Sequence, residues 1–219
     1  MLSFWEKVGR LWQEFRVRLT WRRENAPIDS VAGLVAFIAS RSAFVAQTTL
    51  YGYLKTRIGT RYPRFFEDEA FVASIKRARL HVFTACLADL TIFSVAEASK
   101  DRQTGNTTQR AIALHCYNAA LLEHSGEGPQ EFSTAHDLDA FSCRVEETDW
   151  AGRARRPENF TDSPRALLKW APVADELKAF DAEIVQNSIR FAWRDVRDQL
   201  RQRINGAAIY ADWQRMHAN

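Results

Sequence analysis

Apolar residues recur at helical spacing along almost the whole chain. In residues 1–25 they are separated by steps of three and four, the pattern of an amphipathic helix. No long stretch of the sequence shows the alternation of apolar and polar residues that is typical of strands. The pattern predicts an all-α fold, a helical bundle with an amphipathic helix over 1–25 followed by a single helical domain over 28–219.

Two long apolar runs, at about 30–62 and 67–99, predict a long antiparallel helical hairpin that dominates the bundle. The first run is nearly uncharged from Ser30 to Leu54, so it is long enough to span a bilayer. Polar residues such as Gln47 and the single charge of Arg41 near its middle favour a helix buried in protein instead. The sequence leaves both interpretations of the hairpin open.

Each run contains an isolated charge. Arg41 lies 24 residues before Phe65, where the hairpin is expected to turn, and Asp89 lies 24 residues after it. In an antiparallel hairpin the two side chains then lie at the same level. Because an unpaired buried charge is costly, we expect Arg41 and Asp89 to form a buried polar pair. Alternatively, they line a polar pocket for a ligand or proton.

The rest of the chain predicts shorter helices over 109–124 and 132–150, a helix start at Ser163-Pro164, and a long C-terminal helix over about 173–203. Apolar residues of this last helix form one stripe that includes Leu177, Phe180 and Ile184. A second stripe, shifted by one residue, begins at Val185. The other face of this helix is basic.

Charge is distributed unevenly between the N-terminal third and the remainder. Residues 1–65 contain eleven Lys and Arg but four Asp and Glu, whereas the whole chain has a net charge of +3. Aromatic residues on one face of a helix and cations on the other are typical of a helix at a membrane interface. Packing against the chain's own domain is the alternative. The candidate membrane-surface residues are Phe4, Trp5, Lys7, Arg10, Leu11, Trp12 and Phe15.

Two groups of arginines are candidates for anion binding. One is a loop that contains three Arg within four residues, and the other is a row along one side of the C-terminal helix. Such groups suit phosphates, RNA or lipid headgroups, although Asp198 is placed to form ion pairs within the row. The members of the two groups are Arg153, Arg155, Arg156, Arg190, Arg194, Arg197 and Arg201.

Several familiar catalytic signatures are missing. The chain has no Walker-type loop, G-x-G-x-x-G, G-x-S-x-G or H-E-x-x-H motif, and none of its five His follows a Glu at the spacing used by di-iron bundles. We therefore predict no metal and no cofactor. A hydrolytic site assembled from Cys116 or Cys143 with His136 and a neighbouring Asp stays open, because it depends on tertiary geometry.

Together these features favour a non-enzymatic protein that docks on a membrane surface and binds a membrane-associated protein complex, as an adaptor, assembly factor or accessory subunit. The expected location is peripheral, on the cytoplasmic face of a membrane or the matrix side of an organelle. Three cysteines, an odd count, fit a reducing compartment. The alternatives are a nucleic-acid-binding helical module, and a lipid or small-molecule binding protein or hydrolase.

Overall fold

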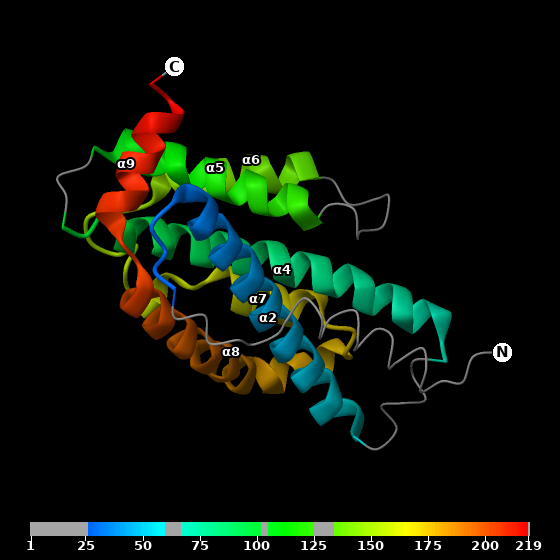
Figure 1. Cartoon of the computed structure of the whole chain (residues 1–219). Coiled ribbons are helices and arrows are strands. Elements are labelled where there is room, and N and C mark those ends of the chain that lie inside the picture. Colours follow the sequence, from blue (N-terminus) through cyan, green and yellow to red (C-terminus); the bar gives the residue numbers. More distant parts are fainter. Residues whose placement is uncertain (1–25, 60–66, 102–104, 125–133, 219) are drawn as a thin grey trace.

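The computed structural model describes residues 26–59, 67–101, 105–124 and 134–218. Within these ranges the chain forms seven α-helices and one short 3-10 helix and contains no strand, which confirms the predicted all-α bundle (Figure 1). The helices are α2 (Val31–Ile58), α4 (Glu69–Ala98), α5 (Asn106–His124), α6 (Thr134–Glu147), η3 (Pro157–Asn159), α7 (Asp162–Trp170), α8 (Asp175–Arg203) and α9 (Gly206–Met216).

The two longest apolar runs form α2 and α4, which pack against each other and run in roughly opposite directions in Figure 1. Each begins at a side chain that caps its free amides. The hydroxyl of Ser30 accepts a hydrogen bond from the amide of Gly33 at 3.2 Å, and the carboxylate of Asp68 accepts from the amide of Ala70 at 2.9 Å. Both helices are long and apolar enough to cross a membrane, by length and composition only.

α4 is the central element of the bundle. From Leu80 to Ser99 nearly every side chain is buried, because α2, α5, α7 and α9 all pack against it. One hydrophobic cluster contains side chains from all seven α-helices, from Val31 in α2 to Trp213 in α9. The apolar character of α4 on all sides is therefore explained by neighbours on all sides.

The beginning of the described chain is joined to the end of α8. Ile28 forms a parallel bridge with Ile204; its amide donates to the carbonyl of Arg203, and its carbonyl accepts from the amide of Asn205, both at 2.9 Å. The following helix, α9, was not among the predicted elements. Asn205 caps it by accepting a hydrogen bond from the amide of Ala208 at 3.1 Å.

Candidate functional site

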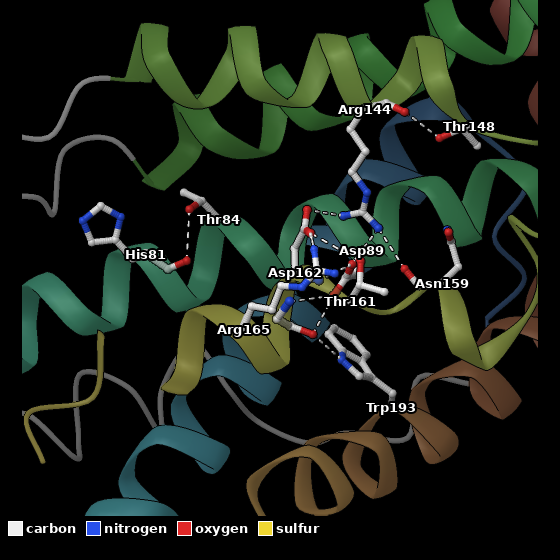
Figure 2. Close-up of polar contacts among 11 residues, drawn as sticks. His81, Thr84, Asp89, Arg144, Thr148, Asn159, Thr161, Asp162, Arg165 and Trp193 are labelled. Carbon is white, nitrogen blue, oxygen red and sulfur yellow. Dashed lines mark hydrogen bonds and ion pairs between the residues drawn. The ribbon is translucent and has the colours of Figure 1, made fainter. Parts of the chain in front are cut away.

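The most extensive buried polar network surrounds Asp89 on α4 (Figure 2). This side chain is fully buried, and its carboxylate accepts hydrogen bonds from the amides of Asp162 at 3.3 Å and Ser163 at 2.8 Å. The hydroxyl of Ser163 donates a third bond at 2.6 Å. Because Asp162 and Ser163 are the first residues of α7, Asp89 caps this helix from a distant part of the chain.

Arg144 of α6 completes the network. Its guanidinium lies 2.7 Å from the carboxylate of Asp89 and 2.6 Å from that of Asp162, and it donates to the carbonyl of Asn159 at 2.9 Å. Burial raises the pKa of Asp89 and the cation of Arg144 opposes that rise. Trp193 of α8 donates from its indole to the hydroxyl of Ser163 at 3.0 Å, so the network joins four helices (Figure 2).

The ion-pair partner of Asp89 differs from the one expected from sequence. Asp89 is buried, as expected for an isolated charge in an apolar run, but Arg144 takes the position that we assigned to Arg41. Counting residues from the hairpin turn gives the level of a side chain along a helix and leaves its rotation about the axis undetermined. Asp89 points toward α6 and α7, whereas Arg41 lies with its guanidinium 5.7 Å from the ring centre of Phe37 on α2.

This network has a structural role. The oxygens of Asp89 face one cation and three hydrogen-bond donors of the same chain, all within the packed bundle. A buried carboxylate satisfied in this way stabilises the helices that supply its partners. We therefore interpret Asp89 and Arg144 as a clamp between α4, α6 and α7.

The remaining candidates for chemistry include two cysteines and His81. Burial raises the pKa of the Cys116 thiol to about 12, which disfavours the thiolate that a nucleophile needs. Cys143 is exposed, and the ring of His81 stacks on that of Trp170 with 3.6 Å between the ring centres. Among the described residues, no group of three or more His, Cys, Asp or Glu side chains is arranged to hold a metal ion.

The predicted arginine row on α8 is partly occupied by contacts within the molecule. Arg201 lies 3.3 Å from the buried carboxylate of Glu97, and Arg197 is half-buried over the ring of Phe160. Arg190 and Arg194 are exposed, as are Arg153 and Arg156 of the basic loop, while Arg155 is half-buried. Two of the four arginines thus make contacts with other parts of the molecule, although Arg201 is itself exposed.

The clearest surface feature is an exposed apolar face on α8, which includes members of the first predicted stripe. The core side of α8 presents Val185 and Ile189, whereas four large side chains on another side remain open to solvent. We call these four residues the α8 apolar face; with their exposed fractions they are Leu177 (43%), Phe180 (82%), Ile184 (67%) and Phe191 (67%). The shift between the two stripes in the sequence was the signal of two separate faces.

Arginine borders the α8 apolar face at one end. The guanidinium of Arg194 lies 5.0 Å from the ring centre of Phe191, one turn away on the same helix. Exposed aromatic residues next to arginine are the composition found at the centres of binding interfaces. The α8 apolar face is therefore the described surface best suited to contact another apolar surface.

The candidate membrane-surface residues Phe4, Trp5, Lys7, Arg10, Leu11, Trp12 and Phe15 lie outside the described residues. Comparison of the chain with protein-family models, with curated proteins and with solved structures found no match.

Proposed function

We propose that this chain is a non-enzymatic helical protein that docks on a membrane surface and binds a membrane-associated protein complex there, as an adaptor, assembly factor or accessory subunit. It acts as a peripheral protein on the cytoplasmic face of the membrane or on the matrix side of an organelle. The observation that carries this proposal is the α8 apolar face, which exposes Phe180, Ile184 and Phe191 on a helix whose opposite side is buried in the core.

Exposed apolar side chains on a well-packed helix support a binding role. Phe180 retains 82% of its accessible surface although the bundle buries large residues such as Trp193 completely. Clustered exposed apolar residues mark surfaces that bind proteins or membranes. Their position on one rigid helix matches the way in which an amphipathic helix docks into the groove of a partner.

The membrane part of the proposal rests on residues 1–25. This segment contains six basic and three acidic residues, and three of the seven Trp of the chain. Trp is favoured at the level of lipid headgroups, and each Lys or Arg near an anionic surface contributes about 1 kcal/mol to binding. The segment supplies the attachment to lipid, and the α8 apolar face supplies the contact with the protein complex.

Vesicle flotation tests the membrane attachment. We expect the full chain to float with vesicles that contain phosphatidylglycerol, to be released by high salt because the attraction is screened, and to lose flotation when residues 1–24 are deleted. Neutral phosphatidylcholine vesicles are the matched control. Failure of the full chain to bind anionic vesicles at low salt would contradict the proposal.

Substitutions on α8 test the contact with the protein complex. Phe180→Ser combined with Ile184→Ser should abolish co-purification of the complex from native membranes while the unfolding midpoint stays unchanged, since both side chains are exposed. Ala179→Ser, which changes an exposed residue on another side of the same helix, is the control. Retention of the complex by the first variant would remove the α8 apolar face from the proposal.

A further inference from the structure

The exposed apolar residues of α8 follow a seven-residue repeat. Leu177, Ile184 and Phe191 are each seven residues apart, and Phe180 lies between the first two of them. Apolar residues at this spacing are the pattern along which two α-helices pack side by side. α8 lies along one edge of the described bundle (Figure 1). The α8 apolar face is therefore suited to receive a second helix along its length.

The charged residues that border the α8 apolar face change sign halfway along it. Glu176, Glu183, Arg190 and Arg197 are also seven residues apart, so they lie along one border of the face. The first three are exposed, and Arg197 is half-buried. This border is acidic in the first half of α8 and basic in the second half. It is therefore complementary in charge to a copy of itself that runs in the opposite direction.

A two-fold axis perpendicular to α8 produces such an antiparallel pair. It places the same border of both helices face to face, and every contact then occurs twice. When Glu183 lies opposite Arg190 of the second copy, Glu176 lies opposite Arg197 of the second copy, because both pairs are centred on the same point of the helix. One register thus satisfies both acids of the border.

Apolar side chains meet in the same register. Equal rise in the two helices places Phe180 within two residues, or about 3 Å, of the level of Phe191 of the second copy. Ile184 lies less than three residues from the two-fold axis, so both copies of this side chain lie near the centre. An apolar, aromatic centre with a charged border is the usual composition of an interface between proteins.

The same charges disfavour a lipid surface on this face. Glu176 and Glu183 are exposed beside Phe180 and would repel anionic headgroups. A second copy of α8 brings arginines to these acids instead. Charge therefore favours a protein surface with a basic border, which the second half of α8 itself supplies.

We propose that two copies of this chain form a dimer through their α8 apolar faces, with the two α8 helices antiparallel and Glu183 opposite Arg190 of the second copy. The face extends about 21 Å from Leu177 to Phe191, so the dimer is weak and depends on protein concentration. The dimer goes beyond the proposed function and does not depend on it. Because both use the same residues, the dimer is the form of the chain without the protein complex.

Exchange of charges tests the dimer in the full chain, by sedimentation equilibrium without lipid. Glu183→Arg alone and Arg190→Glu alone each place like charges opposite one another at two symmetric positions. We expect either change to raise the dissociation constant of the dimer about ten-fold or more. An equimolar mixture of the two variants should dimerise like the parent, because opposite charges face each other again in the mixed pair.

Two matched variants control for the change in net charge. Glu147→Arg on α6 and Arg153→Glu in the basic loop alter exposed residues outside α8 and should leave the dissociation constant unchanged. A parent chain that stays monomeric at all concentrations would overturn the dimer. Single variants that dimerise like the parent, or a mixture that stays monomeric, would overturn the antiparallel register.

Cross-linking of single introduced cysteines tests the direction of the helices. Cys143 is replaced by Ser because it is exposed. Asn187→Cys, an exposed position near the two-fold axis, should be linked between two copies by a short bismaleimide. Asp198→Cys, also exposed on the same side of α8, should give little product, since its two copies lie about 35 Å apart along the helices. Equal yields from the two positions would overturn the antiparallel arrangement.

Co-purification from native membranes separates this inference from the proposed function. A parent chain that is monomeric in solution but retains the protein complex refutes the dimer and leaves the proposed function standing. A parent chain that dimerises with the expected response to charge exchange, but retains no complex, supports the dimer and contradicts the proposed function.

Discussion

Gly206 shows how closely single residues are fitted in this bundle. It begins α9 where that helix passes the end of α4, and a Cβ atom at this position would overlap the carbonyl of Ala98. No side chain fits there without movement of one backbone or the other. Glycine is therefore required by a close approach of two helices and not by an unusual backbone angle.

Gly206→Ala should lower the free energy of unfolding by about 3 kcal/mol, because the added methyl group forces α4 and α9 apart. Gly52→Ala is the matched control, since a Cβ there has no atom within 4 Å, and it should raise stability by about 0.5–1 kcal/mol. Urea unfolding followed by circular dichroism measures both. A Gly206→Ala variant as stable as the parent would show that α4 and α9 move apart at little cost in free energy, and would contradict this prediction.

The identities of a residue and of its neighbours in the sequence predicted whether it is buried better than they predicted its ion-pair partner. An acid in the middle of an apolar run identified Asp89 as buried and in need of a partner, and the structure places it in the core with one. Arg144 lies on a helix of ordinary amphipathic pattern, 55 residues away, so its sequence context carried no sign of the contact. Pairing depends on how helices rotate about their axes, which spacing along one helix does not determine.

At the scale of elements, α7 depends on a cap that it does not supply itself. Its N-cap residue, Thr161, makes no capping hydrogen bond, and the carboxylate of Asp89 bonds the first amides of the helix instead. A nine-residue helix is too short to be stable alone in water. α7 is therefore held by α4 and α6 through the clamp.

Asp89→Ala should lower the free energy of unfolding by about 3–5 kcal/mol, since it leaves the buried guanidinium of Arg144 with one partner fewer and α7 without its cap. Asp89→Asn keeps an acceptor oxygen and should cost less. Asp175→Ala, which removes an exposed carboxylate paired with Lys178, is the control and should cost under about 1 kcal/mol. A loss below about 1 kcal/mol for Asp89→Ala, measured by urea unfolding, would contradict the clamp.

Helix boundaries followed from the sequence where apolar periodicity and capping residues agree. The long apolar runs became α2 and α4, and the expected end of the last long helix at 203 is the end of α8. α9 was missed because it is short, although Asn205-Gly206 marks a turn directly after α8. The solvent-facing stripe of α8 was missed because periodicity identifies apolar faces without showing which of them is covered.

At the scale of the whole molecule, one continuous core links the stability of all helices. Buried side chains from α2 through α9 belong to one hydrophobic cluster, so unfolding of one helix exposes the others. A change in the charge of one side chain is therefore expected to change the free energy of unfolding of the whole molecule. His81, which stacks on Trp170 beside α7, is the titratable side chain placed to show this near neutral pH.

Burial, together with the cations of Lys169, Arg77 and His136, lowers the pKa of His81 below its ordinary value of 6.5. The unfolded chain therefore binds this proton more tightly, and the stability contributed by neutral His81 is present above pH 6.5 and lost as the pH falls through the folded-state pKa. We expect the unfolding free energy to fall as the pH drops below about 6.5. His81→Phe, which keeps a ring against Trp170, should flatten that slope, and an unchanged slope would exclude His81 as its cause.

The position of Asp89 also bears on the order in which the protein is synthesised. The hydrogen-bond donors that satisfy it lie 73 and 74 residues later in the chain, and the ribosome delivers α2 and α4 before any of the helices that cover them. A nascent chain that ends before α6 thus presents two long apolar helices and, in α4, an acid without its ion-pair partner or its hydrogen-bond donors. We expect such a chain to bind chaperones. Prematurely terminated products are expected to be degraded rather than to accumulate.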